Sequence, residues 1–262
     1  MRRSFLTPAL WIPAGLAIAL LVLPLVALIV RAPWVQLPEL LSRSEVLQAL
    51  GLSLATASIA TAVSLVLGIP LALVLARSAE WPAVPRRLLR ALVTVPLVLP
   101  PVVGGVALLL LLGRRGLIGQ FLPFQIPFST SAVVIAQVFV AMPFLVLAVE
   151  GAVRASDRRF ETAAATLGAT RWTILRRVTL PLVAPGVSAG ALLCFTRALG
   201  EFGATITFAG SFPGVTQTLP IATYLELQRD PDAAIALSLT LMVVSVAVLV
   251  TLRDRWVPGL TS

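Results

Sequence analysis

Residues 158–181 read RRFETAAATLGATRWTILRRVTLP, and two long apolar runs enclose them. These runs extend over 131–153 and 182–208, and each is long enough to cross a hydrocarbon layer of about 30 Å as a helix. Within the quoted segment, Phe160 to Leu167 contains good helix formers, and Gly168 suits a helix C-terminus. The segment therefore predicts two short helices joined at a glycine, on one face of a membrane.

Residues at the ends of both short helices support this interpretation. Asp157 precedes the first helix, where its carboxylate can accept hydrogen bonds from free backbone amides. Thr170 can cap the second helix, which carries Trp172. Apolar side chains rimmed by arginine on a polar segment indicate a surface that docks a partner. The alternative is an ordinary connector with solvated arginines.

The composition predicts an all-α, polytopic membrane protein. Of the 262 residues, 58% are hydrophobic and 12% are charged, and the mean hydropathy is +1.00. A soluble fold of this size could not hide so much apolar surface. Backbone inside a bilayer must satisfy its own hydrogen bonds, so the apolar runs should be helices. The six predicted transmembrane helices are 10–30, which we expect to be uncleaved, 48–76, 88–112, 131–153, 182–208 and 232–252.

The positions of the arginines predict the orientation of the chain. With a cytoplasmic N-terminus, inner segments hold 14 of the 20 arginines and outer segments hold 5, including the pair Arg114 and Arg115. Cytoplasmic segments carry the excess of basic residues in membrane proteins, so we expect both termini in the cytoplasm. The net charge of +9 reflects this bias, and no nucleic-acid partner is expected.

Missing residue types exclude most catalytic chemistry. The chain has no His and no Lys, and Cys194 is its one cysteine. Phosphate loops, Schiff bases, His-based triads and HExxH zinc sites all require one of the absent residues, and one cysteine cannot form a cysteine cluster. We therefore expect no enzyme, no catalytic residue, no metal site and no cofactor of its own. Any energy that the protein uses must come from a partner or a gradient.

The segment between the fourth and fifth spans resembles the EAA loop of binding-protein-dependent ABC importer permeases. The family pattern is E-A-A-x3-G-x9-I-x-L-P; here the first Glu falls on Thr162, Glu161 lies one residue earlier, and Val178 replaces Ile. The resemblance covers roughly residues 50–252. It implies that the loop fits a cleft on an ATPase subunit and passes its motion to the spans. The implied coupling residues are Glu161, Ala163, Ala164, Gly168, Trp172, Val178, Leu180 and Pro181.

The same resemblance implies the domain organisation of a type I ABC importer permease. Residues 1–47 would form an N-terminal transmembrane helix and an outer loop. Residues 48–252 would form the ABC transmembrane type-1 domain, with five helices and a cytoplasmic coupling hairpin at 154–181. Residues 253–262 would be a cytoplasmic tail.

The third predicted span contains a cluster of helix breakers. Pro100 and Pro101 lack a backbone donor, and Gly104 begins a glycine pair. These residues interrupt the helical hydrogen-bond ladder and allow a bend, and the freed carbonyls and amides could line a route. Close helix packing through small residues is the alternative explanation.

The fifth predicted span contains an intramembrane charge pair. Arg197 and Glu201 are four residues apart, so one helical face can present both. Charges at membrane depth are costly and indicate function by default. The functional interpretation places Arg197 near an anionic route, with Thr205 and Thr207 as neutral donors. A structural ion pair that positions the spans is an equal alternative.

Residues 197–210, RALGEFGATITFAG, narrow the resemblance to the molybdate permeases. Sulfate permeases are similar, but they typically carry Tyr-Gly-Ser where this chain has Phe202-Gly203-Ala204. The resemblance implies a permease subunit of an ATP-driven importer for molybdate, or for the nearly isosteric tungstate, in the cell inner membrane. The implied partners are ABC ATPase subunits, which use the ATP, a periplasmic or extracellular molybdate-binding protein, and a second permease chain in a homodimer.

Other classes of function make different demands on the sequence. A sulfate permease of the same group is the nearest alternative. A gradient-driven anion carrier would need titratable groups inside the membrane, and Glu150 and Glu201 are the candidates. A passive channel should conduct without nucleotide, and a membrane enzyme is disfavoured because His and Lys are absent.

Overall fold

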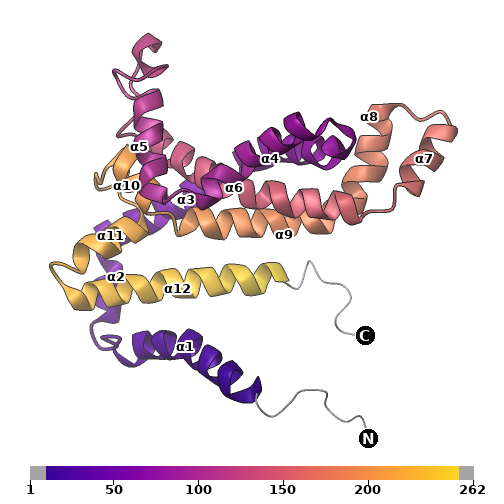
Figure 1. Cartoon of the computed structure of the whole chain (residues 1–262). Coiled ribbons are helices and arrows are strands. Elements are labelled where there is room, and N and C mark those ends of the chain that lie inside the picture. Colours follow the sequence, from indigo (N-terminus) through magenta and orange to yellow (C-terminus); the bar gives the residue numbers. More distant parts are fainter. Residues whose placement is uncertain (1–9, 254–262) are drawn as a thin grey trace, which may run out of the picture.

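We analysed the protein through a computed structural model that describes residues 10–253. All regular secondary structure in this range is helical (Figure 1). Residues 1–9 and 254–262 lie outside the described part, and with them Arg2, Arg3, Arg255 and nearly all of the predicted tail.

The chain folds into long helices that are connected by short ones. Helix α6 begins at a side-chain cap, since the Oγ of Ser129 accepts a hydrogen bond from the Ala132 amide at 3.3 Å. The elements are α1 (Trp11–Val30), α2 (Leu37–Ser42), α3 (Ser44–Arg77), η2 (Ser78–Glu80), α4 (Ala83–Val98), α5 (Pro101–Leu112), η3 (Gly119–Phe121), α6 (Thr130–Ala155), α7 (Arg159–Thr166), α8 (Arg171–Ile174), the π-helical turn η4 (Leu175–Thr179), α9 (Leu180–Leu199), α10 (Gly203–Ala209), α11 (Leu219–Glu226) and α12 (Pro231–Arg253).

Most of the predicted spans are confirmed as single helices. Within residues 10–253, five helices are long and apolar enough to cross a membrane, or six spans if one bent pair is counted as a span. Helices α1, α3, α6 and α12 match the first, second, fourth and sixth predicted spans. The third and fifth spans differ from the prediction, and both differences arise from a break in the helix.

The predicted third span, 88–112, is not one helix. It consists of α4 and α5, whose axes differ by 115°. Leu99 is extended (φ −66°, ψ 134°), and Pro100 and Pro101 follow it without backbone donors. The predicted bend is therefore present, but it is sharp enough to turn α5 away from α4 (Figure 1).

The predicted fifth span, 182–208, is also wrong as a single helix. Helix α9 ends at Leu199, and the separate helix α10 begins at Gly203. The apolar run continues across this break, so hydropathy gives no sign of it. Glu201 therefore lies in the connection between two helices rather than within a helix.

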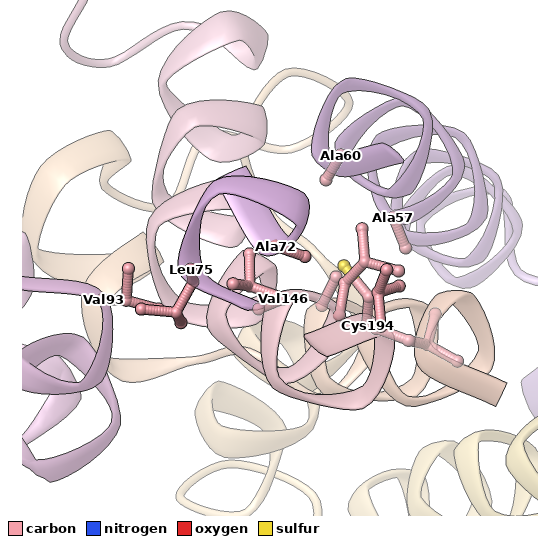
Figure 2. Packing of buried hydrophobic residues seen from close by; sticks show 12 residues of the cluster. Ala57, Ala60, Ala72, Leu75, Val93, Val146 and Cys194 are labelled. Atoms are coloured by element: carbon pink, nitrogen blue, oxygen red, sulfur yellow. The ribbon is translucent and has the colours of Figure 1, made fainter. Parts of the chain in front are cut away.

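Helices α3, α6 and α9 form the main core. Small side chains such as Ala57 and Ala60 of α3 are fully buried there, and they allow the helices to approach closely. Figure 2 shows both alanines pointing toward the part of the cluster that contains Cys194 of α9. A second cluster joins α5, α6 and α10 around Phe208.

Helices α5 and α10 meet through a glycine contact. A Cβ atom added to Gly105 would lie 2.7 Å from the carbonyl oxygen of Ala204 and 2.8 Å from Cβ of Thr207. Gly203 packs against Pro101 in the same way, since its added Cβ would lie 3.0 Å from Pro101 Cβ. The two helix breaks are therefore packed against each other.

This contact predicts a strong effect of a single methyl group. We expect Gly105→Ala to destabilise the protein by about 1–3 kcal/mol, because the added atom meets backbone that cannot move aside. Gly51→Ala in α3 is the matched control, since an added Cβ there meets nothing within 4 Å. Unfolding of the purified protein in detergent measures both; equal stabilities of the two variants would contradict the close approach.

The helix bundle has two distinct ends. The hairpin of α7 and α8, the beginning of α1 and the end of α12 all lie at one end of the bundle, which we call the hairpin end (Figure 1). Arg31, Arg43 and Arg229 belong to the connections at the opposite end. Helix α1 has no buried residue and contacts the bundle only sparsely, so its apolar surface is available to lipid or to another chain.

Candidate coupling hairpin and membrane-buried polar site

The hairpin that the sequence predicts between the fourth and fifth spans is present. Helix α7 covers Arg159–Thr166, and Asp157 Oδ1 accepts a hydrogen bond from the Arg159 amide at 2.9 Å. Gly168 then has φ +81°, a conformation that glycine adopts without a steric cost. Thr170 caps α8 by accepting a hydrogen bond from the Thr173 amide at 3.2 Å. These local contacts confirm the predicted helix ends.

The second arm of the hairpin differs from the expected short helix. Helical residues continue from Arg171 to Leu199 through α8, η4 and α9. Pro181 closely follows the π-helical turn η4, and the altered hydrogen-bond spacing of such a turn accommodates a residue without a backbone donor. The hairpin arm is therefore directly continuous with the span that follows, and α8 is set at an angle to α9 (Figure 1).

The tip of the hairpin exposes large apolar side chains. Leu167 is 88% exposed, Trp172 is 64% exposed and Phe160 is 57% exposed. The guanidinium of Arg176 lies 6.0 Å from the centre of the Trp172 ring. Trp172 was expected to be part of this surface, and Leu167 and Phe160 extend it. A polar segment with such side chains has the character of a docking surface.

Glu161 lies on the inner side of the hairpin and closes it. Its Oε1 accepts a hydrogen bond from Thr179 Oγ1 at 2.6 Å, and the same oxygen lies 3.7 Å from Arg77 Nη2. Thr179 is buried in η4, and Arg77 is the last residue of α3. Glu161 thus joins both arms of the hairpin to the end of α3.

The remaining predicted coupling residues are distributed over both arms. Ala163 and Ala164 lie in α7, with Ala163 exposed and Ala164 half-buried. Val178 and Leu180 are half-buried at the junction of η4 and α9, and Pro181 is exposed beside them. The predicted coupling residues therefore all belong to the hairpin and its junction with α9. Apolar side chains lie on the outer surface of the hairpin, and Glu161 lies between its two arms.

The charge pair of the fifth span joins a partly exposed arginine to a buried glutamate. Arg197 Nη1 lies 2.6 Å from Glu201 Oε2, and the Glu201 side chain is 1% exposed. The other carboxylate oxygen of Glu201 accepts a hydrogen bond from the Ala204 amide at 2.8 Å, which satisfies a free donor at the start of α10. Glu201 therefore bridges the break between α9 and α10.

Further buried polar groups occur in α10, which follows this break, and in α6. The Thr205 hydroxyl is buried and has no hydrogen-bond partner within residues 10–253, whereas Thr207 Oγ1 donates to the Gly203 carbonyl at 2.8 Å. Gln137 of α6 is fully buried, and both of its amide atoms also have no hydrogen-bond partner in the described chain. The sequence analysis missed Gln137, although a single amide in an apolar run was the signal available.

The predicted pathway residues of the third and fifth spans are brought together. Pro100 and Pro101 form the turn between α4 and α5, and Pro101 contacts the start of α10 through Gly203. Gly104 is buried against α6, where an added Cβ would lie 2.9 Å from the Phe139 ring. The two breaks thus form one polar and glycine-rich region, which is separate in the fold from the hairpin at the other end of α9.

Known proteins resemble this chain over almost its whole length. Residues 68–258 match the family model "Binding-protein-dependent transport system inner membrane component". The molybdenum transport system permease protein ModB of Mycobacterium tuberculosis is 50% identical over 248 residues, which cover 94% of this chain and 93% of that protein. The sulfate transport system permease protein CysT of Escherichia coli is 33% identical over 247 residues, which cover 90% and 88%.

Solved structures share the same fold at low sequence identity. The structure of a bacterial ABC transporter involved in the import of the acidic polysaccharide alginate matches with a TM-score of 0.72 and 16% identity, over 97% of this chain and 95% of that one. The helix order, the hairpin between α6 and α9 and the family model all agree. This chain belongs to the inner-membrane components of binding-protein-dependent transport systems, and its fold is that of a type I ABC importer permease.

Proposed function

We propose that this protein is the membrane-spanning subunit of an ATP-driven importer of molybdate. The single observation that supports this most strongly is the 50% identity with a molybdenum permease over nearly the full length of both chains. Identity with a sulfate permease over the same length is 33%, so a sulfate permease is the weaker proposal. Tungstate would be accepted with molybdate, because the two oxyanions are nearly the same size.

ATP hydrolysis is assigned to separate ATPase subunits that bind the hairpin. The exposed side chains of Leu167, Trp172 and Phe160 supply an apolar contact surface. Because α8 is continuous with α9, a displacement of the hairpin would reach the break at Gly200 without an intervening loop. The permease itself would need no cofactor. Closure of the ATPase subunits would favour one conformation of the permease through these differential contacts.

Two copies of the chain would form the translocation route, and a binding protein would deliver the anion to the end opposite the hairpin. One chain supplies one hairpin, so a pair of ATPase subunits calls for a pair of permeases. The exposed apolar faces of α1 and α5 leave room for such contacts. The arginine bias supports a cytoplasmic hairpin end, and a cytoplasmic position of both termini is part of the proposal.

The polar region around the two helix breaks is the proposed part of the route. Arg197 is 28% exposed and can present positive charge to an oxyanion, while its partner Glu201 holds its position. Thr205 and Thr207 would add neutral donors, and Pro100, Pro101 and Gly104 would shape the turn beside them. A gradient-driven carrier would instead require Glu201 to exchange protons during transport.

Uptake in proteoliposomes tests this proposal. Vesicles that contain the permease, the co-encoded ATPase and the binding protein are expected to accumulate labelled molybdate only with ATP. Excess tungstate should compete and excess sulfate should not, and vanadate should stop uptake. Uptake that persists with vanadate and collapses with an ionophore would contradict the proposal and favour the gradient-driven carrier. Strong competition by sulfate would favour the sulfate permease.

A further inference from the structure

A buried carboxylate at the hairpin end connects α6, which leads into the coupling hairpin, with α4. Glu150 lies near the end of α6, and its side chain is 4% exposed. Its Oε1 accepts a hydrogen bond from Arg90 Nη2 of α4, and Arg154 Nε lies 2.8 Å from the same oxygen. A carboxylate at this depth needs such partners, because an unpaired buried charge is strongly unfavourable.

The cluster extends from α6 to a third helix. Arg154 Nη2 donates to the carbonyl oxygen of Leu75 in α3 at 3.5 Å. Two residues further along α3, Arg77 lies 3.7 Å from Glu161 of the hairpin. Two sets of polar contacts, one at Leu75 and one at Arg77, therefore meet at the end of α3 and connect α4 and α6 with the hairpin through that helix.

Helix α4 depends on this cluster because it packs weakly. Val93 is its one buried residue, and the apolar side chains of Leu88 and Leu92 are 60% and 72% exposed. The other side-chain hydrogen bonds of α4 are local: Arg86 donates to the Ala79 carbonyl and Thr94 to the Arg90 carbonyl. The contact between Arg90 and Glu150 is thus the main polar attachment of α4 to the α3–α6–α9 body.

We infer that Glu150 is a positioning residue that carries hairpin motion to α4 and hence to the bend at Pro100. Helix α6 leads directly into the hairpin, and α4 leads directly into the bend and α5. An ion pair suits this role because the buried Glu150 carboxylate loses one of its two arginine partners when the helices separate, although the Arg90 side chain itself is 49% exposed. The pair therefore favours one relative position of α4 and α6. The inference rests on the proposed function, since it assigns the pair to the coupling of ATP hydrolysis and uptake.

The test compares charge removal with charge retention in the complete reconstituted importer. Glu150→Gln and Arg90→Gln are each expected to lower the amount of molybdate imported per ATP hydrolysed by about three- to tenfold, while ATP hydrolysis continues. The double variant should be no worse than either single variant, because both remove the same contact. Arg90→Lys keeps the positive charge and should restore most of the coupling. Arg87→Gln, an exposed arginine of the same helix, is the matched control and should behave like the wild type.

A second measurement, which requires no transport, tests the attachment itself. In a Cys194→Ser background, spin labels at Arg87→Cys in α4 and Ala155→Cys in α6 report the distance between the helices. Glu150→Gln should broaden the distribution of distances between these two labels. The distance between labels at Leu67→Cys in α3 and Ala155→Cys in α6 should stay unchanged, and this control shows that the variant is folded.

The outcomes separate the inference from the proposed function. Normal coupling in Glu150→Gln and Arg90→Gln, or an unchanged label distance, would overturn the inference and leave the proposed function standing. Equal loss of coupling in Arg87→Gln would overturn it as well. Failure of the wild-type complex to import molybdate would refute the proposed function, while the label distances would still report whether Glu150 holds α4.

Discussion

Replacing both Leu167 and Trp172 with aspartate is expected to reduce ATP-driven molybdate uptake by about a hundredfold or more, because the two apolar anchors of the hairpin are lost. Both side chains point away from the bundle, with exposed fractions of 88% and 64%. Neither contributes to the buried core, so the spans should insert and fold normally. The variant should also fail to co-purify with the ATPase subunit.

The physical reason is the cost of burying a carboxylate in an apolar contact. Central interface residues often contribute 2 kcal/mol or more each, and a charge in their place must be desolvated without a partner. Glu161 and Thr179 keep the hairpin closed in the variant, because their hydrogen bond lies on the inner side.

The matched control is Val35→Asp. Val35 is 96% exposed and belongs to the end opposite the hairpin, so the same change in charge and polarity should leave ATPase binding intact. The coupling role of the hairpin is refuted if the Leu167 and Trp172 variant is correctly inserted, binds the ATPase and imports molybdate at the wild-type rate.

Arg197→Leu is expected to lower the free energy of unfolding by about 3 kcal/mol, because it leaves the Glu201 carboxylate buried without its counter-charge. Glu201 is 1% exposed and retains only its hydrogen bond from the Ala204 amide. Adding Glu201→Gln removes the unpaired charge and keeps an acceptor for that amide. The double variant should therefore regain much of the lost stability in chemical unfolding experiments in detergent micelles.

Uptake by the same two variants tests whether Arg197 serves transport or only structure. If Arg197 attracts the anion, as proposed, the double variant will be stable and inactive. Recovery of both stability and molybdate uptake in the double variant would show that the pair is purely structural. Thr196→Ser, beside Arg197 in α9, keeps a hydroxyl group and serves as the control for changes at this depth.

The local features of the hairpin could be predicted from sequence because each depends on nearby residues. Gly168 adopts a positive φ, and Thr170 caps the helix that follows within three residues. The exposure of Leu167 follows from the same turn. The continuity of α8 with α9 was missed, because Pro181 resembles a helix boundary, whereas the π-helical turn η4 before it accommodates the proline within a continuous run of helical residues.

The sequence predicted the break in the third span but not the break in the fifth, for a physical reason. Two prolines after Leu99 predict a bend there, but the bend angle of 115° depends on what α5 packs against. The break after Leu199 has no proline, and its two sides are packed in place by contacts of Gly203 with Pro101 and of Gly105 with Ala204. Contacts between residues about a hundred positions apart leave no local pattern in a sequence.

The sequence by itself determined that this is a membrane protein, how many apolar segments it has and where its hairpin lies, because hydrophobic length, arginine bias and helix caps act over short distances along the chain. Tertiary structure alone decided the 115° angle at Pro100, the break after Leu199, the bridging of that break by Glu201 and the pairing of Glu150 with Arg90. A buried charge is stable only where a partner reaches it. Arg197 lies four residues from Glu201 and could be paired with it from the sequence, whereas Arg90 reaches Glu150 from another helix through the packing of the folded chain.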